Sequence, residues 1–319
     1  MIKESVLVTA IGSMSSASVI ERLKDKYRVV GTSIYERNWI SESVLVDAFY
    51  KISPAKDESD YIYEIIEIIK REGIQYIIPL TDVEVDVMNK NRASIEQLDC
   101  IICISGENTI DICRDKERIE KHLKLKTDVK CIPTISKEEV IINNIFPCIL
   151  KPKRGRSSEG IEIINDKEYL DFVSKRVTCE YLLQPYIGGD VVCVDLIRQK
   201  MSNLSMLVSR KELLRTKNGA GISVHVFCDK GLNEICNVAA EALDINGCVN
   251  FEFIQTDNGD YYFMECNPRF SGGINFSMMS SGYDFINNHV NCFGKGCKID
   301  APVNYGEMYI AKRYVEYEL

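Results

Sequence analysis

Residues 146–164 combine basic and glycine residues in a way that suits the binding of a polyphosphate. An apolar stretch, typical of a strand, delivers Lys151 and is followed by a short loop and another apolar stretch. The basic and glycine residues of this loop are Arg154, Gly155, Arg156 and Gly160. A lysine at a strand end, beside backbone N–H groups that can turn inward, can neutralise phosphate oxygens. The alternative is a basic hairpin turn that faces solvent. A Walker loop is excluded, because Lys151 precedes the glycines.

Residues 251–273 place acidic and amide side chains where they could bind a divalent metal. The alternation of apolar and polar residues predicts two strands joined by a tight turn, with Glu252 and Glu265 opposed across the ladder. Asn267 lies on the same face as Glu265, and Arg269 follows if the strand continues past the proline. Opposed carboxylates need a cation between them, and an all-oxygen set fits magnesium better than zinc. The alternative is the solvent face of an ordinary hairpin.

The elements that must position these segments fall into three groups. Up to about residue 108, strands alternate with helices, which predicts an open parallel sheet with helices on both faces. Its predicted strands are residues 5–10, 27–34, 74–80 and 100–105, with helices at about 17–24 and 59–73. A helix over 111–125 follows, and then short strands at 146–152, 161–165 and 181–187 predict a small lid. The last third pairs residues 191–199 with 204–213, has a helix over 232–243, and ends its pattern in the 249–265 hairpin.

Four segments occur in the order and approximate spacing of the ATP-grasp superfamily. They are RDKERIEKHL with Lys116, ILKPKRGRSSEGI with Lys151, LLQPYIGGDVVCVD, and MECNPR. Over about residues 1–290 the chain therefore resembles this superfamily. It most resembles the large subunit of carbamoyl phosphate synthetase and its single-module relatives, including carboxylate–amine ligases. The amino-terminal segment VTAIGSMSSASVI is similar to the domain that precedes the grasp fold there.

The resemblance implies a role for each matching residue. Lys116 and Lys151 would hold the nucleotide phosphates. The loop that closes over those phosphates would contain Gly155, Arg156, Ser157, Ser158 and Gly160. The hinge that reads adenine would be Gln184, Pro185, Tyr186 and Ile187, with Asp190 at the ribose hydroxyls. The magnesium ligands would be Glu252, Glu265 and Asn267, while Arg269 would steady the transferred phosphoryl group and Arg210 the reacting carboxyl.

Three positions depart from the pattern of the superfamily. Ser157 stands where the loop usually has glycine, and Pro185 stands where the hinge usually has an acidic residue. Asp190 is one methylene shorter than the common glutamate. The first departure affects the stiffness of the loop, and the other two affect base preference and nucleotide affinity. None of them removes a phosphate-binding or metal-binding group.

The resemblance implies an α/β and α+β protein, an ATP-grasp fold preceded by a Rossmann-like parallel-sheet domain. The expected domains are residues 1–110 and 111–319, the latter divided into a lid at about 127–186 and a larger part at 187–319. The expected activity is an ATP-dependent ligase that activates a carboxylate as an acyl phosphate and transfers it to an amine. The expected cofactor is Mg²⁺, as two ions that Mn²⁺ could replace. Two alternatives are a carbamoyl phosphate synthetase-like enzyme that uses bicarbonate, and a nucleotide-binding subunit without turnover.

Composition restricts the partners and the location. The chain of 319 residues is 45% hydrophobic and 27% charged, with a formal net charge of −8, so no overall basic field attracts nucleic acid. Its start and its apolar runs predict neither a signal peptide nor a membrane span, which favours the cytoplasm. The thirteen cysteines are scattered, and we expect buried, reduced thiols. A homodimer formed through the first domain is compatible with the sequence.

The roles of two acidic residues stay open at this point. Asp82 and Glu84 follow a predicted strand of the first sheet, where open parallel sheets bind ligands, and could hold an ammonium group. The alternative is a helix start, capped by Asp82 with Glu84 in its first turn. The sequence identifies neither the carboxylate nor the amine substrate.

Overall fold

A computed structural model describes residues 3–155, 159–177, 180–217 and 219–319. Its amino-terminal part is a parallel sheet in the order β3-β2-β1-β4-β5. The strands are β1 (Ser5–Val8), β2 (Arg28–Ser33), β3 (Ala48–Lys51), β4 (Ile74–Ile78) and β5 (Ile101–Ile102). The helices are α1 (Ser16–Leu23), η1 (Arg37–Trp39), η2 (Ser41–Val44), α2 (Glu58–Glu72), α3 (Asp82–Lys90) and α4 (Arg92–Glu96). The sequence predicts this sheet without β3, because β3 is a short edge strand whose residues are only half buried.

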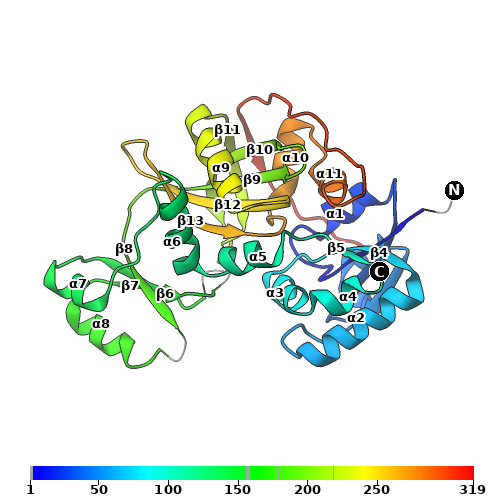
Figure 1. The fold of residues 1–319 in the computed structure, drawn as a ribbon, viewed down its shortest axis with the longest axis horizontal. Helices are drawn as coiled ribbons and strands as arrows, with labels where there is room; N and C mark the ends of the chain where they lie inside the picture. The colour runs from blue at the N-terminus through cyan, green and yellow to red at the C-terminus, as the bar shows by residue number, and fades with distance from the viewer. Residues whose placement is uncertain (1–2, 156–158, 178–179, 218) are drawn as a thin grey trace.

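The six-stranded antiparallel sheet, in the order β13-β12-β9-β10-β11-β14, forms the centre of the molecule (Figure 1). Its strands are β9 (Asp190–Gln199), β10 (Leu204–Arg215), β11 (Gly221–Phe227), β12 (Gly247–Gln255), β13 (Tyr261–Asn267) and β14 (Met308–Ala311). One apolar cluster packs a face of the sheet against α5 (Glu107–Cys113), α6 (Lys116–Lys126) and α9 (Lys230–Ala242). The opposite face packs against α10 (Ile274–Ser281) and α11 (Phe285–Asn291).

The prediction of a single helix over residues 111–125 is wrong. The chain forms α5 and α6 with a break at Arg114 and Asp115. The Asp115 carboxylate accepts hydrogen bonds from the backbone N–H groups of Glu117 and Arg118, as an N-cap does. This cap places Lys116 in the first turn of α6 rather than in the middle of a helix.

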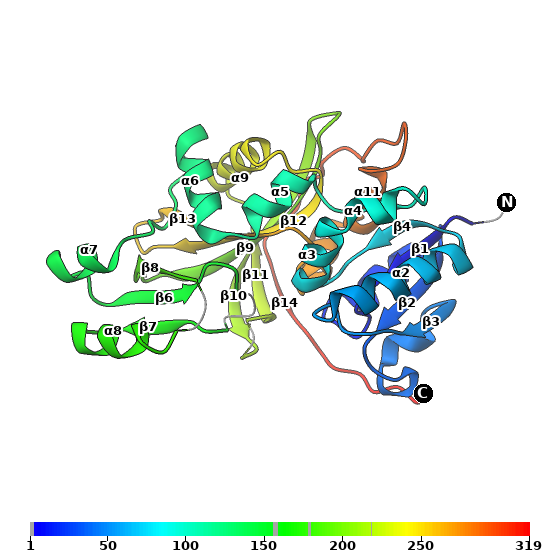
Figure 2. The same cartoon turned by 60° about the horizontal axis from the view of Figure 1, so that its bottom comes forward.

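A third, smaller sheet in the order β7-β6-β8 projects from one end of the molecule (Figures 1 and 2). It contains β6 (Cys148–Pro152), β7 (Glu162–Ile164) and β8 (Tyr181–Pro185), with α7 (Lys137–Ile142) and α8 (Lys167–Ser174) beside it. Its own apolar cluster includes Val140, Leu150 and Leu170. The three short strands occur where the sequence predicts a lid.

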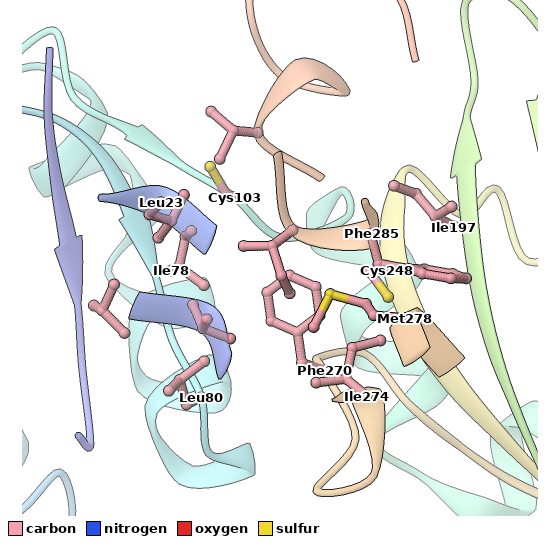
Figure 3. Close-up of a cluster of buried hydrophobic side chains, with 14 of the residues drawn as sticks. Leu23, Ile78, Leu80, Cys103, Ile197, Cys248, Phe270, Ile274, Met278 and Phe285 are labelled. Carbon is pink, nitrogen blue, oxygen red and sulfur yellow. The ribbon is translucent and has the colours of Figure 1, made fainter. Parts of the chain in front are cut away.

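The parallel sheet and the central sheet share one apolar core. Figure 3 shows Leu23, Ile78 and Leu80 of the amino-terminal part facing Phe270, Ile274 and Met278 of the central part. Burial of this apolar surface is the main favourable term in holding the two parts together. Side chains at their border therefore have a defined relative position.

His289 lies in this border and gives a prediction on stability. Its Nδ1 accepts a hydrogen bond from the Cys248 N–H at 2.8 Å, and its Nε2 lies 2.9 Å from the Cys103 carbonyl oxygen. Burial lowers the pKa of His289 from 6.5 to about 4. The unfolded chain therefore takes up a proton below about pH 6.5 that the folded chain excludes until about pH 4.

The free energy of unfolding should consequently fall as the pH falls from 6.5 to 4, by up to about 3 kcal/mol from this residue. Urea unfolding across that range measures the loss. His289→Gln retains a donor and an acceptor but cannot be protonated, so it should have a shallower pH dependence than the wild type. Parallel profiles for the two proteins would contradict the assignment.

Among the residues that the structure describes, no helix combines the length and apolar composition that crossing a bilayer requires. The cysteines within the same ranges are free thiols, and only Cys228 and Cys297 are exposed. Burial is the first cause that raises the pKa of many of the others, including Cys103, Cys236 and Cys248. Such thiols are poor nucleophiles and pack as small apolar side chains.

Candidate active site

The hairpin formed by β12 and β13 brings the two predicted metal-binding carboxylates together. Glu252 is the direct cross-strand partner of Glu265, as predicted, and a register shift between Glu252 and Phe253 brings the two together. Phe251, Phe253 and Phe263 point to the opposite face, where they are buried in the core beneath α6 and α9. The buried aromatic face fixes the register of the hairpin, because a slip of one residue would exchange the two faces.

Asn267 completes an all-oxygen donor set beside the two carboxylates. Its Nδ2 lies 3.2 Å from Glu252 Oε1 and 3.4 Å from Glu265 Oε1. Burial, and then the facing Glu265 carboxylate, raise the pKa of Glu252 to about 7. Two partly buried carboxylates in this arrangement repel each other, and a divalent cation between them would remove the repulsion. The donor set therefore fits Mg²⁺, with the Asn267 amide oxygen as a further ligand after rotation of the amide.

Two largely buried lysines lie opposite these carboxylates; the Lys116 side chain is 11% exposed. Lys116 Nζ is 3.1 Å from Glu265 Oε2 and donates a hydrogen bond to the Gly155 carbonyl at 3.3 Å. Lys151, on β6, is 5% exposed. Burial lowers the pKa of Lys151 to about 8, against the opposing effect of Glu265. Burial would raise the pKa of Glu265, but Lys116 and Lys151 outweigh it and hold that pKa below its usual range.

One cavity of about 190 Å³ is lined by Lys116, Lys151, Gly155, Glu252 and Glu265. Three separate elements, α6, β6 and the β12–β13 hairpin, therefore direct cations and carboxylates into a shared space. The interpretation of residues 146–164 as a solvent-facing basic turn does not fit a buried Lys151. This space can accept an anionic group and a divalent cation together.

The other residues predicted to bind nucleotide lie farther from these groups or are outside the described ranges. Gln184 is buried on β8 and donates a hydrogen bond to the Ile132 carbonyl at 3.0 Å, while Tyr186 is half exposed. Pro185 ends β8, and Ile187 follows in the connection to β9. None of these four residues is among the described residues that line the 190 Å³ cavity. Asp190, the first residue of β9, forms a 2.8 Å ion pair with Lys211.

The predicted phosphate loop is described only in part. Arg156, Ser157 and Ser158 lie outside the described residues. Gly155 lines the cavity with the two lysines. Gly160 has a φ of +70° and lies against Pro152, where a Cβ atom would approach the Pro152 ring to 3.1 Å. The left-handed conformation favours glycine at this bend, and a Cβ atom would fit only if the Pro152 ring shifted slightly.

Arg269 reaches the site by a turn and not by continuation of the strand. β13 ends at Asn267, and the Arg269 N–H bonds back to the Asn267 carbonyl at 2.8 Å. The guanidinium of Arg269 then forms a 2.8 Å ion pair with Asp82 of α3. Asp82 also lies 3.3 Å from Arg114. The helix-cap interpretation of Asp82 is wrong, because Thr81 is the N-cap residue and the Asp82 carboxylate binds two arginines instead.

Asp82 gives a second prediction on stability. It is 4% exposed; burial would raise its pKa, but Arg269 and Arg114 keep the pKa below its usual range. Asp82→Asn should lower the free energy of unfolding by about 2 kcal/mol, because the buried Arg114 and the partly buried Arg269 lose their shared carboxylate. Asp86→Asn is the matched control: Asp86 binds the same Arg114 at 2.8 Å but is largely exposed. The control should change stability by less than about 0.5 kcal/mol in the same urea titration, and equal losses would contradict this account.

Arg210 is part of a buried network of charged side chains and is not an unpaired cation. It is 2% exposed, and its guanidinium binds Asp195 at 2.6 Å and Glu212 at 3.1 Å. It also donates a hydrogen bond to Ser271 at 3.1 Å. Burial would lower the pKa of Arg210, but Asp195 and the other acidic neighbours outweigh it and raise the pKa. Its positive charge is therefore already balanced within the protein.

A larger cleft of about 560 Å³ joins these groups, and the lining includes Asp82, Arg210, Arg215, Glu252, Glu265 and Arg269. Sequence reasoning missed Arg114, Asp195, Glu212 and Arg215 as parts of this site. Alternation offers one weak signal for Asp195, a charge within the apolar run VVCVDLI of β9. The others have ordinary surface-like contexts in the sequence, and only the packing of separate strands brings them together.

One family model and several known proteins are similar to this chain in sequence. Residues 178–312 match a family model described as "ATP-grasp in the biosynthetic pathway with Ter operon". A 154-residue alignment with the carbamoyl phosphate synthase large chain of Clostridium botulinum is 28% identical and covers 44% of this chain and 14% of that protein. The D-alanine–D-alanine ligase of Fusobacterium nucleatum is 24% identical over 270 residues, which cover 81% of this chain and 83% of that ligase.

Solved structures have the same fold. The biotin carboxylase domain of Hydrogenobacter thermophilus 2-oxoglutarate carboxylase, a dimer in complex with MgADP, ADP and bicarbonate, superimposes with a TM-score of 0.79 at 18% identity. That match covers 97% of this chain and 74% of that chain. N5-carboxyaminoimidazole synthetase from Staphylococcus aureus gives 0.75 at 16% identity, covering 96% and 82%.

Proposed function

We propose that this chain, which has the ATP-grasp fold, is an ATP-dependent ligase that joins a carboxylate to an amine and releases ADP and phosphate. The single observation that carries the proposal is the cavity shared by Lys116, Lys151, Glu252 and Glu265. A pocket of opposed cations and carboxylates suits a nucleotide triphosphate tail with divalent ions, and suits an uncharged substrate poorly. The resemblance to D-alanine–D-alanine ligase over most of both chains supports a ligase.

In this proposal the two lysines bind the phosphate oxygens of ATP. Glu252, Glu265 and Asn267 would hold two Mg²⁺ ions, which Mn²⁺ could replace, and Gly155 with the following loop would lie over the phosphates. The bound metal would supply charge neutralisation at the transferring phosphoryl group. Arg269, held in place by Asp82 at 2.8 Å, would steady that group from the side of the cleft. Gln184 to Ile187 and Asp190 would contact the nucleoside, with Asp190 leaving its ion pair with Lys211.

The reaction then has two steps. A carboxylate oxygen attacks the γ-phosphorus in line, the bond from that phosphorus to ADP breaks, and an acyl phosphate forms. A neutral amine next attacks the acyl carbon, the bond from that carbon to the phosphate oxygen breaks, and the nitrogen loses a proton. The small β6–β8 sheet would exclude water between the two steps, because water would hydrolyse the acyl phosphate.

The buried free thiols support a reducing, cytoplasmic location.

Hydroxylamine provides a direct test, because it converts any acyl phosphate into a hydroxamate without a specific amine. The purified chain is incubated with ATP, Mg²⁺, hydroxylamine and one carboxylate at a time: the common amino acids, acetate, succinate and bicarbonate. We expect ATP-dependent hydroxamate and phosphate in equal amounts with one class of carboxylate. Phosphate release with bicarbonate alone would favour a carbamoyl phosphate synthetase-like reaction. ATP binding without phosphate release across the panel would favour a nucleotide-binding subunit.

A further inference from the structure

Three cavities follow one another across the molecule. The 190 Å³ cavity and the 560 Å³ cleft share Arg215, Glu252 and Glu265 in their linings. The cleft in turn shares Gly12, Ser13 and Thr81 with a third cavity of about 460 Å³. The third cavity lies within the amino-terminal part, which also contains Asp82 and Glu84.

The third cavity lies at the carboxyl ends of the parallel strands. Its lining comes from the segments that follow β1, β2, β3 and β4, and the order of the strands reverses between β1 and β4. Open α/β sheets offer a crevice for ligands at this position. A volume of about 460 Å³ is in the range of small-molecule sites.

The lining of the third cavity is mainly apolar. Its apolar side chains are Ile11, Ile34, Ile52, Pro54, Ala55 and Val83. Glu84, the acidic residue of the lining, accepts hydrogen bonds from Thr81 Oγ1 at 2.8 Å and from the Tyr61 hydroxyl at 3.2 Å. Its carboxylate is therefore occupied within the protein. The basic residue of the lining, Lys56, is exposed, and the rest of the surface left for a ligand favours an apolar group. Ile34 and Tyr35 are 46% and 53% exposed, so this apolar surface is open to solvent.

The two-step chemistry assigns an order to the three cavities. The substrate carboxylate must lie next to the γ-phosphate of ATP. It would therefore lie between the 190 Å³ cavity, which would hold the phosphates, and the rest of the 560 Å³ cleft. The amine must approach the acyl carbon from a side that the departing phosphate does not occupy. The end of the cleft remote from Lys116 and Lys151 adjoins the third cavity through Gly12, Ser13 and Thr81.

We propose that the third cavity binds the apolar substituent of the amine substrate, so that the enzyme selects amines with a branched aliphatic or aromatic group. This proposal rests on the proposed function and adds the class of the acceptor to it. The amine nitrogen would lie in the cleft beside Thr81. As the carbon–nitrogen bond forms and the bond from the acyl carbon to the phosphate oxygen breaks, its proton would pass to the departing phosphate. Each apolar group that enters the cavity gains free energy in proportion to the surface it removes from water.

The test compares acceptors that differ only in the apolar group. With the carboxylate identified by the hydroxamate assay, product formation is measured by mass spectrometry for glycinamide, valinamide, leucinamide and phenylalaninamide. We expect kcat/KM for leucinamide or phenylalaninamide to exceed that for glycinamide by about 10-fold or more. Ile34→Asp and Tyr35→Ser should raise KM for the preferred amide by about 10-fold with little change in kcat.

Ile142→Asp is the matched control, because Ile142 is 79% exposed on α7, outside all three cavities. It should leave both constants at their wild-type values. Since Ile34 and Tyr35 are already open to solvent, their substitution should not unfold the chain. Hydroxamate formation by the two variants should fall less than about twofold, because hydroxylamine has no apolar group to lose.

Two results would overturn the inference while the proposed function stands. One is hydroxamate formation together with equal use of glycinamide and leucinamide. The other is a KM for the preferred amide that Ile34→Asp and Tyr35→Ser leave unchanged. Absence of hydroxamate with every carboxylate is a different result, which would overturn the proposed function and the inference with it.

Discussion

Lys151→Met should lower ATP-dependent phosphate release by about 1000-fold, while the folded protein stays as stable as the wild type or becomes more stable. The loss of activity follows because the buried ammonium would no longer neutralise the transferring phosphoryl group. The effect on stability has the opposite sign, since burial already disfavours this charge and lowers its pKa to about 8. Methionine has a similar volume and no charge to desolvate. Phosphate release at saturating ATP and the thermal unfolding midpoint measure the two effects.

The matched control for this variant is Lys153→Met, two residues along the chain. Lys153 is partly exposed, at 26% of its side chain, and forms an ion pair with Glu117 at 2.6 Å. Its loss should change activity by less than about threefold. ATP with Mg²⁺ should raise the unfolding midpoint of the wild type and of Lys153→Met, but not that of Lys151→Met, because ligands stabilise only the proteins that bind them. A fully active Lys151→Met would show that the cavity does not bind the phosphates.

Glu265→Gln should lower the same activity by about 100- to 1000-fold and raise the Mg²⁺ concentration needed for half-maximal rate. Glutamine keeps the size of the side chain but cannot supply the charge that a divalent ion needs. The substitution also removes the 3.1 Å partner of Lys116. The positive charges of Lys116 and Lys151 would then no longer be offset by the Glu265 carboxylate. Rates measured over a Mg²⁺ titration separate the loss of metal binding from a loss in the chemical step.

Asp260→Asn controls for a lost carboxylate on the same hairpin. Asp260 lies at the turn end, where it forms an exposed 2.8 Å ion pair with Lys130. We expect its Mg²⁺ dependence to match that of the wild type. If Glu265→Gln and Asp260→Asn had the same Mg²⁺ profile, the assignment of Glu265 as a metal ligand would be wrong.

Local patterns in the sequence predict most of the elements but not their ends. The β12–β13 hairpin follows from alternation, because side chains along a strand have a fixed period of two. The opposition of Glu252 and Glu265 also depends on a register shift between Glu252 and Phe253, which alternation does not predict. The break between α5 and α6 was missed, since Asp115 could cap a new helix or lie within a longer one. The path of Arg269 was also missed, because its direction depends on Asp82, which is 187 residues away in the chain.

By itself, the sequence determined which candidate groups for binding phosphate and metal this protein has, and on which helices and strands we expect them. The tertiary structure alone decided which of them are free to act. In the folded protein Asp195 and Glu212 neutralise the charge of Arg210, and Asp82 forms ion pairs with two arginines. Lys151 instead lies buried in the cavity that it shares with Glu265. The physical reason is that periodicity sets the face of a side chain within one element, whereas burial and pairing of charge depend on contacts between elements distant in sequence.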